Sequence, residues 1–169
     1  MAVRDFIVAL SELQTDPPLA GIEEIRQFNP QRHEMEHLTG IAFECHETKR
    51  CAAFKDVTHE EFWCRGHMPG MPLMPGVIML EAVAQMCSFF AMKYDLLGAK
   101  VVGFGGLDDV RFRDPVIPGD RLVLMCQLIK ARRNQIIVCR FQGVVGNSLV
   151  LEGQLKGIPI PVELLSQRV

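Results

Sequence analysis

One stretch, residues 66–86, constrains this chain more than any other. It reads GHMPGMPLMPGVIMLEAVAQM, and its first half holds three prolines and three glycines. No regular helix or strand can run through prolines and glycines at that density. After Gly76 the chain is apolar on all sides as far as Met92, which predicts a helix buried in the core. The sequence therefore predicts a stiff loop that leads directly into a central helix.

The predicted helix carries two strongly polar side chains, Glu81 and Gln85, which stand four residues apart and so share one face. A carboxyl group inside an apolar helix is costly to ionise unless a partner stabilises its charge. His67 lies in the loop just before the helix, from which it can return to meet Glu81. A histidine titrates near neutral pH and suits a base, and a sheltered glutamate keeps its proton more readily than a surface glutamate and suits an acid. The residues point to the joint involvement of His67 and Glu81 and leave open which of them handles each proton.

The stretch GHMPGMPLMPGVIMLEAVAQ resembles the signature of bacterial FabZ-type 3-hydroxyacyl-[acyl-carrier-protein] dehydratases, roughly G-H-F-P-G-x-P-x-x-P-G-V-x-x-x-E-A-x-A-Q. Met68 stands where the family usually has Phe. A later segment, GLDDVRFRDPVIPGD, resembles the family pattern G-I-D-E-x-R-F-x-x-P-V-x-P-G-D. The resemblance covers roughly residues 41–158. It implies an α+β protein with the hotdog fold, in which an antiparallel sheet wraps around one long central helix.

The resemblance also implies an activity. The protein is expected to be a lyase that dehydrates (3R)-3-hydroxyacyl-[acyl-carrier-protein] to the trans-2-enoyl product, in fatty-acid or related lipid biosynthesis. His67 and Glu81 are the expected catalytic residues. Gly76, at the helix N-terminus, and Gln85, which can orient Glu81, are assigned to substrate binding. The family needs no cofactor beyond the phosphopantetheine arm of the carrier. Its members are homodimers, often joined as a trimer of dimers, with each site at a dimer seam.

Three other activities are compatible with the same fold. A related hotdog hydratase acts on coenzyme A thioesters, and a hotdog thioesterase releases a free thiol. A non-catalytic hotdog protein binds acyl chains without turnover. Neither the loop nor the helix pattern separates these four alternatives, so they are distinguished by substrate and product.

Residues 33–37 read HEMEH, the HExxH pattern of zinc proteases. If residues 30–38 are helical, with Asn29 as N-cap and Pro30 at the first position, both histidines lie on one face and Glu34 is the base. However, the segment is short and ends at Gly40. The pattern also supplies no third zinc ligand. We interpret it as a polar helical turn and predict no metal site.

Length, charge and cysteines bound the remaining possibilities. At 169 residues, the chain is expected to form an N-terminal arm, residues 1–20, and a single hotdog domain, residues 21–169. A net charge of −2 does not indicate a nucleic-acid surface. The best candidate for a membrane span, residues 77–92, is interrupted by Glu81 and Gln85. Six cysteines without a CxxC pair are interpreted as reduced residues of a cytoplasmic protein.

The remaining elements follow from apolar patterns and turn residues. A short helix is predicted at residues 22–28, and two strands at 41–47 and 51–57. The central helix is predicted to end at Gly98 as a C-cap. Four further strands are predicted as a meander, at residues 100–112, 121–131, 135–145 and 149–158.

Overall fold

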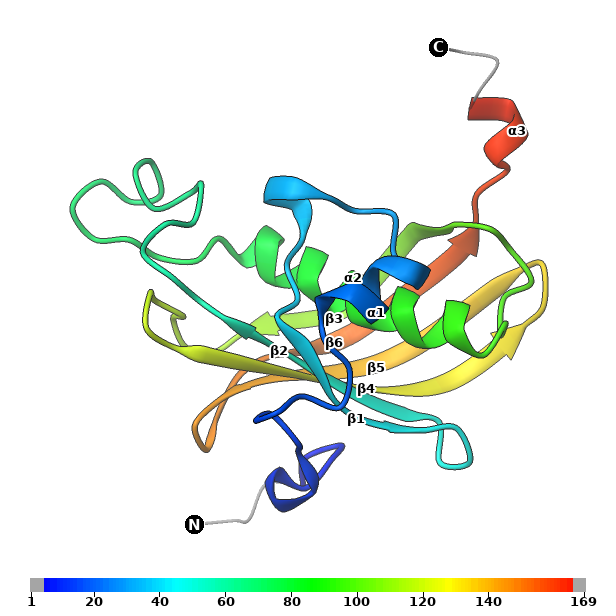
Figure 1. The fold of residues 1–169 in the computed structure, drawn as a ribbon, viewed down its shortest axis with the longest axis horizontal. Coiled ribbons are helices and arrows are strands. Elements are labelled where there is room, and N and C mark those ends of the chain that lie inside the picture. Colours follow the sequence, from blue (N-terminus) through cyan, green and yellow to red (C-terminus); the bar gives the residue numbers. More distant parts are fainter. Residues whose placement is uncertain (1–4, 166–169) are drawn as a thin grey trace.

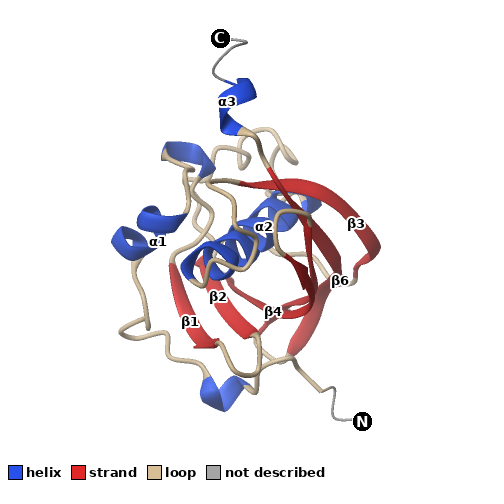
Figure 2. Ribbon diagram, turned by 90° about the vertical axis from the view of Figure 1, so that its right-hand side faces the viewer, coloured by secondary structure: helices blue, strands red, loops and turns tan. Residues whose placement is uncertain are grey.

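The computed structural model describes residues 5–165, in which one six-stranded antiparallel sheet curls around one long helix (Figures 1 and 2). The strands are β1 (Gly40–Cys45), β2 (Arg50–Asp56), β3 (Val102–Phe112), β4 (Arg121–Arg132), β5 (Ile136–Val145) and β6 (Ser148–Pro159). The helices are α1 (Ile22–Phe28), α2 (Gly76–Lys93) and α3 (Val162–Leu165), with short 3-10 helices η1 (Leu10–Glu12) and η2 (His33–Met35). The expected hotdog architecture is confirmed.

The strand order across the sheet is β1-β2-β4-β5-β6-β3. The predicted meander is correct for β4, β5 and β6 but wrong for β3, which lies at the far edge beside β6. The reason is α2: the chain runs along the concave face between β2 and β3, and β4 then returns to pair with β2, Ala53 opposite Leu124. Among the described strands, β3 pairs with β6 alone, so its other edge is free.

Helix α2 fills the concave side of the sheet. Most of its apolar side chains pack in the core, and Met86, Phe89 and Phe90 are almost completely buried. By length and composition α2 could cross a membrane, but 61% of it is buried inside this protein. This burial is typical of a core helix, because the sheet already covers most of the apolar surface that would contact lipid in a membrane span.

The end of α2 differs from the prediction. The helix stops at Lys93, and Asp95, with a φ of 49°, takes the left-handed position usually held by glycine. The amide of Asp95 bonds to the carbonyl of Met92, and that of Leu96 to the carbonyl of Ala91, which is the pattern of a Schellman motif. Gly98 is left-handed too, but in the turn that follows.

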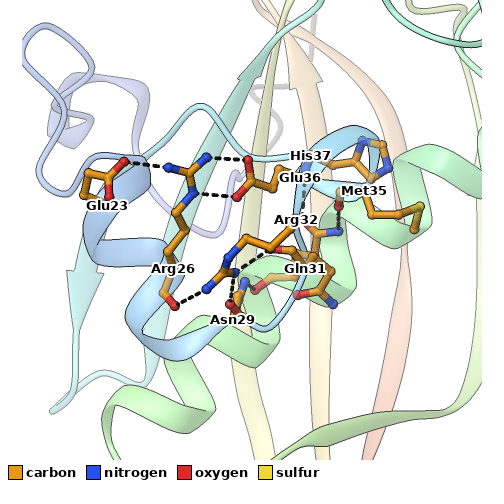
Figure 3. Close-up of polar contacts among 9 residues, drawn as sticks. Glu23, Arg26, Asn29, Gln31, Arg32, Met35, Glu36 and His37 are labelled. Carbon is orange, nitrogen blue, oxygen red and sulfur yellow. Dashed lines mark hydrogen bonds and ion pairs between the residues drawn. The ribbon is translucent and has the colours of Figure 1, made fainter.

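Residues 29–37, called the strap below, cross the side of α2 without forming the predicted helix (Figure 3). Only the single turn η2 is helical. The Asn29 side chain does not cap a helix but donates to the carbonyl of Gln85 in α2, 2.9 Å away. The guanidinium of Arg32 bonds to the carbonyls of Asn29, Gln31 and Arg26. Tertiary contacts thus use backbone groups that a helix would have needed.

The arm packs against the outer face of the sheet. Its described part, residues 5–20, places Ile7 and Val8 in a second apolar cluster with Met125 and Leu149 of the sheet. The backbone amide of Ile7 donates to Oε1 of Gln142, 2.8 Å away. The convex side of the sheet is therefore partly covered by the chain itself.

Candidate active site

The loop before α2 holds His67 by three hydrogen bonds. Its backbone amide donates to the carbonyl of the buried Trp63, 2.8 Å away, and its own carbonyl accepts from the amide of Leu73 at 2.9 Å. Ring atom Nδ1 lies 2.8 Å from the carbonyl oxygen of Leu73. A carbonyl can only accept, so in the neutral ring the proton lies on Nδ1. The other nitrogen, Nε2, keeps its lone pair and can act as a base.

The start of α2 offers free backbone donors. Pro75 is the N-cap, and its carbonyl accepts from the amides of Ile78 and Met79. Helix geometry leaves the amides of Gly76 and Val77 without an acceptor inside the helix, so they point out of its positive end. A Cβ on Gly76 would lie 2.7 Å from the ring of Phe112, so no side chain fits there without displacing that ring.

His67 and the helix start face the same cleft, which has a volume of about 590 Å³. Its walls are mainly apolar, with Leu73, Val77, Leu80 and Phe112 among them. An apolar cleft with one histidine and one set of backbone donors suits a substrate that has a hydrocarbon chain and a single reactive carbonyl.

Glu81 is half-buried one turn further along α2, and Gln85 orients its carboxyl group. Nε2 of Gln85 donates to Oε1 of Glu81, 2.9 Å away. Because Oε1 accepts this bond, the proton of the neutral acid belongs on Oε2. Gln85 itself is 2% exposed, and its amide also bonds to the backbone of Met35 and His37 in the strap. The hydrogen bonds to the strap fix the side chain of Gln85, and its remaining hydrogen bond fixes the carboxyl group of Glu81.

Glu81 is not among the residues around the cleft of its own chain. It shares a helix face with Val77, one turn earlier, which is 72% exposed. The chain thus brings His67 and Gly76 together and leaves Glu81 and Gln85 on a neighbouring face of α2. Sequence reasoning did not single out Leu73 or Phe112 as site residues. The available signal for Phe112 was its place in the second family motif, where it matches the Phe of the R-F pair.

The HExxH segment does not have the geometry of a metal site. His33 is exposed with a φ of 56°, whereas His37 is 1% exposed, and the two do not lie on one helix. Within residues 5–165, no cluster of three or more His, Cys, Asp or Glu side chains is placed to hold a metal ion. The ring nitrogens of His37 have no hydrogen-bond partner in the described chain. Burial lowers the pKa of His37, and the charge of Lys55 lowers it further, against the opposing effect of Glu61.

Comparisons with known proteins agree with this geometry. The family model described as a FabA-like domain matches residues 29–154. The 3-hydroxyacyl-[acyl-carrier-protein] dehydratase FabZ of Desulfotalea psychrophila is 41% identical over 109 residues, which span 63% of this chain and 72% of that protein. The FabZ of Lawsonia intracellularis is 38% identical over 142 residues, 82% of this chain and 90% of that protein.

Two solved structures show the same fold at low sequence identity. One is the dehydratase heterocomplex ApeI:P from Xenorhabdus doucetiae, with a TM-score of 0.68 at 13% identity, covering 85% of this chain and 95% of the other. The other is Cj0977, a virulence protein from Campylobacter jejuni, with a TM-score of 0.63 at 14% identity, covering 85% and 94%. With the family model and both relatives in agreement, this chain belongs to the FabA-like family, among the FabZ-type 3-hydroxyacyl-[acyl-carrier-protein] dehydratases.

Proposed function

We propose that this protein is a hydro-lyase that removes water from (3R)-3-hydroxyacyl groups on acyl carrier protein and yields trans-2-enoyl groups, in fatty-acid or related lipid biosynthesis. The observation that carries the proposal is the apolar cleft that His67 and the N-terminal residues of α2 line together. The relatives from Desulfotalea and Lawsonia bear the name of this activity. We place the reaction in the cytoplasm, where thiols such as the six free cysteines stay reduced.

In the first half of the reaction, the C2–H bond breaks. The C2 proton is weakly acidic, so the thioester carbonyl must be polarised as negative charge grows on its oxygen. The amides of Gly76 and Val77, together with the positive end of α2, are suited to that task. Nε2 of His67 takes the proton, and the carbonyl of Leu73 holds the ring and stabilises the charge it gains through the proton on Nδ1.

In the second half, the C3–O bond breaks and the C2–C3 double bond forms. The departing hydroxyl takes the proton from Oε2 of Glu81 and leaves as water. His67 is then protonated and Glu81 ionised, so one proton must leave the histidine and one must return to the carboxyl before the next turnover. This scheme uses a base, an acid and backbone donors of the chain itself, and it requires no cofactor or metal.

We further propose that each site is shared between two subunits of a homodimer. Two observations support this assembly: the free edge of β3, and the position of Glu81 on α2, outside the cleft of its own chain and one turn after the exposed Val77. A second copy paired along β3 extends the sheet and brings its Glu81 to this cleft, and twofold symmetry then makes two equal sites. Three such dimers can form a hexamer.

The carrier is expected to approach at the mouth of the cleft. Arg113 lines the cleft and pairs with Glu152, and the exposed Arg65 lies two residues before His67. Arg113 is paired, so the exposed charge of Arg65 is the one we expect to favour a negatively charged carrier and to increase its rate of association.

The decisive assay presents 3-hydroxyacyl groups of graded length on acyl carrier protein and, separately, on coenzyme A. Formation of the conjugated enoyl thioester is followed by absorbance, and release of thiol by a thiol-reactive dye. The expected result is enoyl product with the carrier substrates and no thiol release. Turnover confined to coenzyme A esters indicates a hydratase, thiol release indicates a thioesterase, and acyl binding without either product overturns the catalytic assignment.

A further inference from the structure

The side-chain amide of Gln85 has no free hydrogen-bonding group left. Its Nε2 donates to the carbonyl of Met35 at 2.7 Å and to Oε1 of Glu81 at 2.9 Å. Its Oε1 accepts the amide of His37 at 2.9 Å. Reversing this amide would leave the buried amide of His37 without its partner, at a cost of about 1–3 kcal/mol, and would place two oxygens against each other at the part-buried carbonyl of Met35.

The orientation of this amide decides what Glu81 can do. In the observed orientation an N–H faces Glu81, and the acidic proton is left on Oε2, free for the substrate. In the reversed orientation the amide oxygen would face Glu81 and accept that proton in a hydrogen bond, holding it away from the reaction. The backbone of the strap, through Met35 and His37, therefore selects the productive orientation.

The strap is attached to the rest of the protein by an ion pair as well as by Asn29. Arg26 of α1 contacts Glu36 of the strap at two points, with Nε 2.6 Å from Oε1 and Nη2 2.9 Å from Oε2 (Figure 3). A two-point contact between a guanidinium and a carboxylate fixes orientation as well as distance. The Glu36 side chain is 16% exposed, and its hydrogen bond with Arg26 lowers the pKa of its carboxyl group.

We propose that Glu36 is a positioning residue for the catalytic acid: its pair with Arg26 seats the strap, the strap fixes the amide of Gln85, and that amide orients Glu81. The inference rests on the proposed dehydratase function. It adds a role for residues that lie outside the cleft and outside the two segments that resemble the family.

Glu23 provides a matched control. It also pairs with Arg26, at 2.6 Å, but it is on α1 itself and its side chain is 82% exposed (Figure 3). A pair within one helix cannot hold the strap. Replacing Glu23 by Gln thus removes the same charge from the same arginine without releasing residues 29–37.

The test compares kcat and KM of Glu36→Gln, Glu23→Gln, Gln85→Met and the double variant Glu36→Gln/Gln85→Met on a carrier-bound 3-hydroxyacyl substrate. Glu36→Gln is expected to lower kcat about tenfold with little change in KM, because a misplaced acid affects chemistry rather than binding. Glu23→Gln is expected to match the wild type. In the Gln85→Met background, Glu36→Gln should cause no further loss of kcat, because Glu36 is proposed to act on Glu81 only through Gln85. Full additivity of the two losses overturns the proposal.

A second readout does not depend on turnover. In ¹⁵N-labelled protein, the side-chain amide signals of Gln85 are followed through a pH titration. They are expected to report the ionisation of Glu81 in the wild type and in Glu23→Gln, and to shift or broaden in Glu36→Gln. Absence of dehydration by the wild type refutes the proposed function but leaves this experiment intact. Unchanged signals and unchanged kcat in Glu36→Gln refute the strap mechanism alone.

If Glu36→Gln fails to fold, Arg26→Lys tests the same link. Lysine keeps the positive charge but cannot make the two-point contact. A lowered kcat with altered Gln85 signals supports the proposal, and wild-type behaviour in both measurements overturns it.

Discussion

The carbonyl oxygen of Leu73 lies 2.8 Å from Nδ1 of His67, and this contact determines which ring nitrogen can accept a proton. In the proposed mechanism, the loop supplies the base as the side chain of His67 and fixes its tautomer through a backbone carbonyl. The proposal therefore gives the carbonyl positions of the loop a role as well as its one histidine.

The variant His67→Asn separates these two contributions. The amide nitrogen of Asn can replace Nδ1 as donor to Leu73, but no basic nitrogen replaces Nε2. Turnover is expected to fall at least about a hundredfold, while the melting temperature stays close to that of the wild type. His67→Ala, which loses both groups, serves as the comparison. A slow enoyl assay and thermal unfolding check the result, and turnover retained in His67→Asn would exclude Nε2 as the base.

Glu81→Gln is expected to fold and to lose most turnover. Gln keeps the shape of the side chain but has no acidic proton, and a general acid contributes about a hundredfold or more. Replacing a half-buried carboxyl group by a neutral one is not expected to destabilise the protein. Steady-state kinetics and circular dichroism measure the two effects. Near-normal rates would remove Glu81 from the mechanism.

A shared site predicts that two inactive variants rescue each other. In a heterodimer of His67→Ala and Glu81→Gln, one site carries both lesions and the other is intact. Random re-pairing makes half of the dimers mixed, so roughly a quarter of wild-type activity should return. The subunits must be mixed under partly unfolding conditions, and mass spectrometry verifies exchange. Exchange without recovered activity would place both residues of each site in one chain.

Gly76→Ala tests the contact between the helix start and Phe112. Alanine is favoured over glycine in a helix by up to about 1 kcal/mol, so a purely local effect would stabilise α2. The added methyl group, however, meets the ring of Phe112 at 2.7 Å and forces it to move. A loss of kcat/KM of at least about tenfold is expected. Phe112→Leu in the same chain should restore part of it, as a double-mutant cycle can show.

Stability is expected to decrease with acid because of His37. Burial makes its pKa lower in the folded protein than in the unfolded chain, where it is about 6.5. Below about pH 6.5 the unfolded chain therefore binds more protons, and the free energy of unfolding falls by at most about 1.4 kcal/mol per pH unit. Urea denaturation between pH 5 and 8 measures this slope. His37→Phe, which keeps a buried ring, should flatten it, and an unchanged slope would show that His37 does not cause it.

Much of the fold could be predicted from local patterns. Periodicity and turn residues that lie close together in the sequence are enough to predict three elements: the helix at Ile22–Phe28, the hairpin of β1 and β2, and the apolar helix after Gly76. Other features depend on distant partners. Residues 29–37 failed to become a helix because Gln85, about fifty positions later, takes their backbone groups. The placement of β3 beside β6 also depends on how the chain passes over the sheet.

The candidate site shows the same division. The proline-rich loop and the spacing of His67 to Glu81 could be read from the sequence, because they lie within fifteen positions of one another. The pairing of Glu81 with Gln85 follows from helix geometry. Residue types alone do not reveal that Phe112, on a distant strand, lies beside Gly76. They also do not reveal the role of Leu73, which acts through its backbone carbonyl.

The apolar character of α2 has a consequence for the protein while it is being made. The helix leaves the ribosome before β3, β4, β5 and β6, which form most of the sheet around it, and synthesis adds about 5–20 residues per second. For several seconds the chain displays a segment that could pass for a membrane span. A charged side chain within such a segment costs up to about 3 kcal/mol to insert into a bilayer. In the nascent chain, the carboxylate of Glu81 therefore also opposes misdirection of α2 into lipid.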